Sequence, residues 1–302
     1  MPVALLTACL FALTGVCATQ ASRLLGGAKA NFWRLAIAAA ILSLYAHLWG
    51  QGWGGDAPLW FFSAGAIGFG AGGYCMFQAL RRTGSTLTLL VEQCAATLFA
   101  AAIGWVFLGA SLTWLEIFLI FLILSGVVLG MSPGPLPNLP RSVLRTGVVF
   151  ALMAALFQAI SFNLSRHGFL LVAESGETLT ALTAAYQRLV GGVIVALSLY
   201  GLTYLILRQK IFAPPARQVH PSPFPAPVWV IANALFGPVL GVSSMLWAIR
   251  LVENVGLVQA IAATATLLTV PLATLLEGAR PQKTFYFGAI LALVGVAALL
   301  LS

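Results

Sequence analysis

Long apolar runs dominate this sequence, and charged residues are too scarce for the surface of a soluble fold. The chain has 15 Lys or Arg and 7 Asp or Glu among 302 residues, and 61% of its residues are hydrophobic. A soluble domain carries roughly a quarter charged residues, because its surface faces water. No fold of this length hides so much apolar surface in its own core. The sequence therefore predicts a membrane protein.

Ten of the apolar runs are long enough to cross a bilayer, which takes about 20 residues of helix. Helices are expected because every backbone polar group must be satisfied within lipid. The predicted fold class is therefore an all-α polytopic membrane protein with ten transmembrane helices. The predicted spans are residues 3–21, 32–49, 59–80, 86–108, 113–131, 146–164, 180–206, 227–248, 255–276 and 284–301.

The two halves of the chain carry similar patterns in the same order, which predicts two five-helix repeats. An odd number of spans in each half would place the halves in opposite orientations, a common plan among transporters. The matched segments are 8–23 with 151–166, 32–35 with 186–189, and 77–81 with 246–250. We expect a first repeat over 1–131, a Pro-rich linker over 132–145 and a second repeat over 146–302.

The basic residues divide unequally between the predicted loops. Only Arg166 and Arg250 follow even-numbered spans. The positive-inside rule then places the odd loops in the cytoplasm and both termini outside. The basic residues that follow odd-numbered spans are Arg23, Lys29, Arg81, Arg82, Arg141, Arg145, Arg208, Lys210, Arg217, Arg280 and Lys283.

Several other function classes lack support. The net charge of +8 is spread in ones to threes between apolar runs, so no nucleic-acid partner is expected. The three histidines are scattered and Asp56 is the single aspartate, which argues against an enzyme, a metal site or a cofactor. Residues 68–73 match GxGxxG, but no strand precedes them, so they predict close helix packing instead.

The chain resembles the drug/metabolite transporter superfamily, and within it the ten-helix EamA-type exporters. The features that carry the resemblance are the arginines at 34 and 188 and the segments Ala79–Ser85, Phe107–Thr113 and Gly288–Val296. Among the branches, the chain is most similar to the YddG-type aromatic amino acid exporters. The resemblance implies a multi-pass protein of the bacterial cytoplasmic (inner) membrane that exports small metabolites, with neutral or aromatic amino acids as substrates.

The chain departs from the family pattern at two positions and in its loop charges. Relatives usually have Gly-Glu at the end of the fourth and ninth spans. Here Ala110 replaces the first Glu, and Glu277 precedes its glycine. Many relatives are also described with cytoplasmic termini, opposite to the orientation that the loop charges predict.

Glu92 is the most informative single residue, because a charge at bilayer depth costs about 2.5–3.5 kcal/mol on insertion scales. It could bind a substrate ammonium or a coupling proton, or it could pair with an arginine near the interface. Arg34 and Arg188 could attract a substrate carboxylate. We favour the alternative that they anchor helix ends at the headgroups.

Polar and aromatic side chains on the apolar helices are candidates for a central cavity, since amides in spans either hold helices together or line water-filled space. The predicted cavity residues are Tyr74, Gln78, Glu92, Gln93, Phe157, Gln158, Asn163, Tyr186, Trp247 and Gln259.

These features together predict a secondary transporter that works by alternating access between two halves. We expect a small-molecule substrate, the lipid bilayer as the surrounding partner, and a monomer. The alternatives are a channel or facilitating pore, or a multidrug or other-metabolite carrier of the same superfamily.

Overall fold

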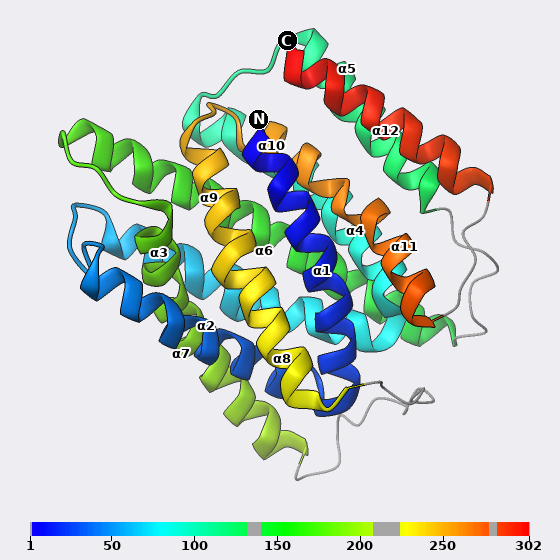
Figure 1. The fold of residues 1–302 in the computed structure, drawn as a ribbon, viewed down its shortest axis with the longest axis horizontal. Coiled ribbons are helices and arrows are strands. Elements are labelled where there is room, and N and C mark those ends of the chain that lie inside the picture. Colours follow the sequence, from blue (N-terminus) through cyan, green and yellow to red (C-terminus); the bar gives the residue numbers. More distant parts are fainter. Residues whose placement is uncertain (1, 132–139, 208–223, 278–282, 302) are drawn as a thin grey trace.

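A computed structural model describes residues 2–131, 140–207, 224–277 and 283–301 (Figure 1). Every regular element in this part of the chain is a helix, as the sequence predicts. The elements, in order, are α1 (Pro2–Leu25), α2 (Gly27–Leu48), α3 (Pro58–Gly65), η1 (Ala66–Gly72), α4 (Gly73–Leu108), α5 (Trp114–Gly130), α6 (Arg141–Glu174), α7 (Ala181–Leu207), α8 (Ala226–Ala234), η2 (Leu235–Gly241), α9 (Val242–Arg250), α10 (Val255–Ala263), α11 (Ala265–Glu277) and α12 (Lys283–Leu301).

Part of the expected loop structure falls outside the described residues, namely linker positions 132–139 and the basic residues Arg208, Lys210, Arg217 and Arg280. The helix α6 begins at Arg141, so the last residues of the predicted linker are helical.

Among the described residues, eight helical stretches are long and apolar enough to cross a membrane. They are Pro2–Leu25, Gly27–Leu48, Leu87–Leu108, Arg141–Glu174, Ala181–Leu205, Ala226–Arg250, Val255–Leu272 and Thr284–Leu301. The predicted span at 113–131 corresponds to α5, which is apolar but has only 17 residues. The predicted span at 59–80 runs through α3, η1 and the start of α4. Large apolar side chains face outward, with Trp114 88% exposed, as expected for a lipid-facing surface.

Two glycines set helix boundaries that the apolar pattern leaves open. Gly84 lies inside α4 with φ 79° and ψ 176°, a region that is essentially restricted to glycine. It divides α4 into two segments, of which the first completes the predicted span at 59–80 and the second corresponds to the span at 86–108. Gly26, with φ 83°, is the single residue between α1 and α2, so the ten-residue loop expected there is almost absent.

Two π-helices, η1 and η2, interrupt otherwise α-helical stretches. Such bulges occur where the regular hydrogen-bond ladder is disturbed, and they are frequent at functional sites. Pro238 lies inside η2 and has no backbone N–H to donate. Gly65 ends α3 just before η1, and a Cβ there would collide with the backbone carbonyl of Arg188 on α7. The close approach of α7 to this stretch therefore requires glycine.

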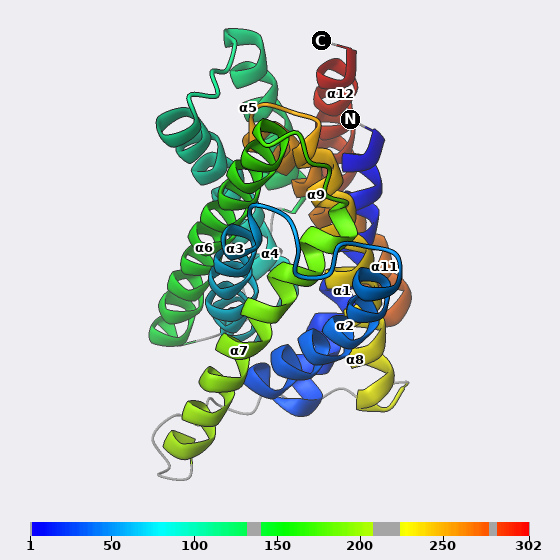
Figure 2. The same cartoon turned by 90° about the vertical axis from the view of Figure 1, so that its left-hand side faces the viewer.

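The first helix of each half packs against helices of the other half. The helix α1 contacts α8, η2, α9, α10 and α11, all of which come from the second half of the chain. The helix α6 contacts α3, η1 and α4 of the first half. The helix α2 lies against α7, and α5 lies against α12 at the edge of the molecule (Figure 1). In Figure 2, α6 and α4 lie on one side of the bundle, and α1 and α8 lie on the other.

The contact between α5 and α12 depends on small residues. Gly126 and Gly130 stand one turn apart on α5, and Gly288 faces them from α12. A Cβ at Gly126 would lie 2.5 Å from the backbone nitrogen of Ala292. Small residues at this spacing allow two membrane helices to approach closely, where packing rather than hydrophobicity holds them together.

Candidate functional site

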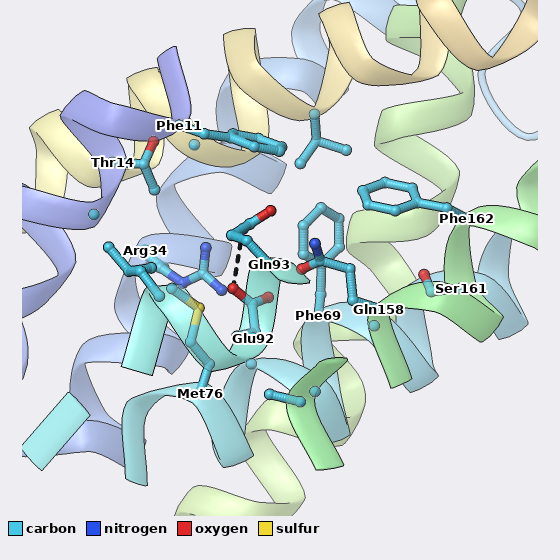
Figure 3. A pocket seen from close by; sticks show the side chains of 18 of the residues that line it. Phe11, Thr14, Arg34, Phe69, Met76, Glu92, Gln93, Gln158, Ser161 and Phe162 are labelled. Atoms are coloured by element: carbon cyan, nitrogen blue, oxygen red, sulfur yellow. Dashed lines mark hydrogen bonds between the residues drawn. The ribbon is translucent and has the colours of Figure 1, made fainter. Parts of the chain in front are cut away.

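A cavity of about 90 Å³ lies among the central helices and receives side chains from both halves of the chain (Figure 3). Its lining comes from α1, α2, η1, α4, α6, α7, η2 and α9. The lining residues are Phe11, Thr14, Gly15, Arg34, Gly68, Phe69, Gly72, Gly73, Met76, Leu89, Glu92, Gln93, Ala154, Gln158, Ser161, Phe162, Arg188, Gly237 and Val242.

One end of the cavity contains Arg34 and Glu92. Figure 3 shows the guanidinium of Arg34 and the carboxylate of Glu92 pointing toward each other. Arg34 donates to Asn31 Oδ1 at 3.0 Å, and Gln93 Nε2 donates to Glu92 Oε2 at 2.9 Å. Both charged side chains are buried, with exposures of 7% and 1%. This end therefore holds one positive and one negative charge that face each other, both sheltered from solvent.

The other end contains Arg188, which is only 2% exposed. Its Nη1 donates to Ser165 Oγ at 2.6 Å, and its Nη2 donates to Ser161 Oγ at 2.8 Å. The guanidinium carbon lies 4.8 Å from the ring centre of Phe162 and 5.3 Å from that of Phe69. Both hydrogen-bond partners are neutral, and no charged partner of Arg188 lies among the residues whose side chains are described.

Glycines make room for both guanidinium groups. A Cβ at Gly68 in η1 would collide with Ser161 Oγ, the acceptor of the Arg188 hydrogen bond. A Cβ at Gly73, at the start of α4, would lie 2.7 Å from Asn31 Oδ1 and 3.2 Å from Arg34 Nη2. The glycine-rich stretch that resembles GxGxxG therefore provides close helix packing, as its lack of a preceding strand suggests, and it also gives each arginine its space.

The side of the cavity formed by α6 presents a regular series of residues. Gln158, Ser161 and Phe162 line the cavity, and Ser165 stands one turn beyond Ser161, so the four share one face of the helix. Gln158 Nε2 is buried and has no hydrogen-bond partner. The phenylalanines Phe69, Phe162 and Phe11 give the cavity aromatic walls (Figure 3). The cavity thus combines apolar walls with a few polar groups, as expected of a binding site for a small amphipathic molecule.

The sequence profile of the EamA-like transporter family matches residues 1–131 and 145–301, which is nearly the whole chain. The chain belongs to the EamA-like transporter family. It is thus a multi-pass integral membrane protein and a transporter of the drug/metabolite transporter superfamily, whose members are not enzymes in general.

A solved crystal structure resembles this EamA-like transporter over 100% of its chain and 97% of the other chain. The TM-score is 0.71 and the sequence identity is 17%, so the likeness concerns the fold alone. No curated protein matches the sequence.

Three residues predicted for the central cavity of the transporter line the cavity described above, namely Glu92, Gln93 and Gln158. Two more are buried in the helix bundle. Gln259 Nε2 donates at 2.9 Å to Oε1 of Gln93, which lines the cavity, and Asn163 Nδ2 donates to the carbonyls of Ala100 and Ala159.

The other predicted cavity residues lie elsewhere in the transporter. Gln78 accepts a hydrogen bond from Arg82, and Tyr74 pairs with Thr203. Tyr186 contacts His47 at 3.1 Å. Trp247 is 53% exposed and lines a separate groove. Phe157 packs against the Gly72 position without lining the cavity.

The favoured sequence interpretation of Arg34 and Arg188, as headgroup anchors, is wrong, because the structure buries both in the centre of the transporter. The alternative, that they attract a substrate carboxylate, stays a prediction. The matched positions of the two arginines in the two repeats were the sequence signal that could have pointed to a shared central location. The apolar pattern could not show their depth, because the packing of α2 and α7 against the other helices decides how deeply each arginine is buried. In the described part of the chain, no group of three His, Cys, Asp or Glu residues could hold a metal ion.

Proposed function

We propose that this protein is an alternating-access carrier that exports small amphipathic metabolites, with neutral and aromatic amino acids as its substrates. The observation that carries the proposal is the central cavity, which receives side chains from both halves of the chain. A carrier that rocks two halves around such a site exposes it to each side of the membrane in turn.

The order and packing of the elements support two inverted five-helix halves. A π-helix interrupts the third apolar stretch of each half, as η1 and η2. The helix α1 packs on the interrupted stretch of the second half, and α6 packs on that of the first half. The contacts of α2 with α7 and of α5 with α12 would then lie on the axis that relates the halves.

The chemistry of the cavity supports a zwitterion with an apolar side chain. Its phenylalanines suit an apolar body, and Arg188 and Gln158 suit a polar head. A cavity of about 90 Å³ is small beside the roughly 300–1,000 Å³ of typical ligand pockets. The carrier would therefore widen its centre to admit substrate.

We propose a location in the bacterial cytoplasmic membrane, as the family resemblance implies, with both termini outside, as the loop charges favour. Exposed Arg141 stands at the start of α6 and exposed Glu174 at its end, so the two ends of this helix carry opposite charges. The resemblance to the YddG-type branch supports aromatic amino acids as substrates, and we propose that the carrier works as a monomer.

Counterflow in proteoliposomes tests the carrier function. Liposomes preloaded with unlabelled phenylalanine should accumulate labelled phenylalanine faster than empty ones, since a carrier exchanges substrates across its cycle. A pore would show no such stimulation.

A cross-link between the halves tests alternating access. Gln187 donates to the carbonyls of Gly52 and Gly54, and a Cβ at Gly50 would lie 2.5 Å from Thr183 Oγ1. In a background without the native cysteines, oxidation of Gly50→Cys with Thr183→Cys should stop counterflow, and reduction should restore it. Each single cysteine variant is the control. Full flux in the cross-linked protein would contradict rocking halves.

A further inference from the structure

We propose that Arg188 anchors the carboxylate of the transported molecule, so that the site selects small monocarboxylates with an apolar or aromatic body whether or not they carry an ammonium group. The inference rests on the proposed carrier function and specifies which part of the substrate its cavity recognises.

The charges that line the cavity do not balance. Two guanidinium groups, Arg34 and Arg188, and a single carboxylate, Glu92, line it. Glu92 faces Arg34 rather than Arg188 (Figure 3) and interacts with it electrostatically. One positive charge, on Arg188, is thus left without a countercharge among the residues whose side chains are described. An uncompensated charge at this depth is costly, and a monoanionic ligand would neutralise it.

The donors around Arg188 are also incompletely used. A guanidinium has five N–H donors, and the two described hydrogen bonds go to Ser165 and Ser161. The Nε of Arg188 is buried and has no partner, and neither has Nε2 of Gln158 on the same cavity. Carboxylates accept several such donors at once, and guanidinium groups bind them with matching geometry.

The two serines position Arg188 without neutralising it. Ser165 Oγ donates to the carbonyl of Ser161, and Ser161 Oγ donates to the carbonyl of Ala64. Each hydroxyl therefore turns its lone pairs toward the guanidinium. The guanidinium lies over the rings of Phe69 and Phe162, which extend the site with apolar surface.

An ammonium group on the substrate is dispensable in this arrangement. The carboxylate of Glu92 already accepts from Gln93 and faces Arg34, so it is committed within the protein. Arg34 is likewise occupied, since it donates to Asn31 and lies over the ring of Phe77. The matched arginines thus have different roles, and Arg188 is the one available to a ligand.

Calorimetric titration of the purified full-length transporter tests this recognition with three probes of the same aromatic body. L-Phenylalanine and 3-phenylpropanoate, which both have a carboxylate, should bind with similar affinity. Phenethylamine, which has only the ammonium, should bind about 10- to 100-fold more weakly, as expected for the loss of hydrogen bonds to a charged group. Equal binding of phenethylamine would overturn the proposal. Competition by chloride or phosphate as strong as that by 3-phenylpropanoate would also overturn it, in favour of an inorganic anion site.

Variants assign the effect to Arg188. Arg188→Gln should lose the binding of 3-phenylpropanoate, and Arg188→Lys should retain part of it. Arg166→Gln is the matched control, because it removes an equal charge outside the cavity and should bind as the wild type does. Wild-type binding by Arg188→Gln would overturn the proposal.

Thermal unfolding separates a ligand site from a structural role. Without ligand, Arg188→Met should unfold at the same temperature as the wild type or higher, because an unpaired buried charge is removed. A large fall in that temperature would assign Arg188 to structure and overturn the proposal.

Transport assays distinguish failure of this inference from failure of the carrier function. Counterflow of phenethylamine that is insensitive to Arg188→Gln would overturn the inference and leave the carrier standing. Binding of 3-phenylpropanoate without counterflow of any probe would support the carboxylate site and overturn the carrier function.

Discussion

At the residue scale, the centre of this protein is organised by two buried arginines with different surroundings. Arg34 faces Glu92, whereas Arg188 is held by two serine hydroxyls and two phenylalanine rings (Figure 3). Buried charges in membrane proteins are costly and usually mark a functional site. The contrast between the two arginines is a difference in charge compensation, and it leads to different expectations for their variants.

We expect Glu92→Gln to lower the temperature of thermal unfolding in detergent, because it leaves Arg34 as a second uncompensated charge. Replacing Arg34 as well, by Gln, should recover part of the loss, with a coupling of about 0.5–3 kcal/mol between the two sites. The exposed carboxylate of Glu253 supplies the control, since Glu253→Gln should change little.

Counterflow of phenylalanine by the Glu92→Gln variant tests whether Glu92 also has a role in transport. If Glu92 serves mainly to balance Arg34, the double variant should transport better than Glu92→Gln alone. Equal transport by the single variant and the wild type, with equal stability, would show that the pair has no role.

At the element scale, small residues decide how closely the helices approach one another. Glycines at helix contacts permit backbone packing that any side chain would prevent, as at Gly65 against α7 and at Gly126 against α12. The π-helices η1 and η2 and the Gly84 break interrupt the regular α-helical geometry of the central helices.

Gly126→Ala should destabilise the protein by about 1–3 kcal/mol, because its Cβ would press on the backbone of Gly288 and Ala292. Gly201→Ala on α7 is the matched control, since nothing lies within 4 Å of the added Cβ. It should be neutral or slightly stabilising. Thermal unfolding of both variants in the same detergent measures the difference, and an equal effect at the two sites would contradict the packing argument.

At the scale of the whole molecule, the distribution of charge along α6 leads to a test of orientation. Ser142 and Ser175 are exposed at opposite ends of this helix, on the basic and the acidic side. In a background without the native cysteines, Ser175→Cys should react with a membrane-impermeant maleimide on intact cells. Ser142→Cys should react only after permeabilisation, because the positive-inside rule places its end in the cytoplasm. The reverse pattern would place both termini inside.

The sequence alone determined the class of this protein, because the shortage of charge and the long apolar runs are incompatible with a soluble fold. It also led to the family, and to Glu92, Gln93 and Gln158 in the central cavity. These features depend on composition and local pattern, which can be read along a chain.

Only the tertiary structure decided which charges face each other. Arg34 and Arg188 match in sequence, yet Glu92 approaches one and two serines of α6 hold the other. Likewise, Tyr186 and Trp247 lie on apolar helices, and the hydrophobic periodicity of these helices did not show that the two side chains lie away from the cavity. The physical reason is that an apolar span is favourable in lipid at every rotation about its own axis. The rotation is set instead by glycine contacts and buried polar partners from helices distant in the chain.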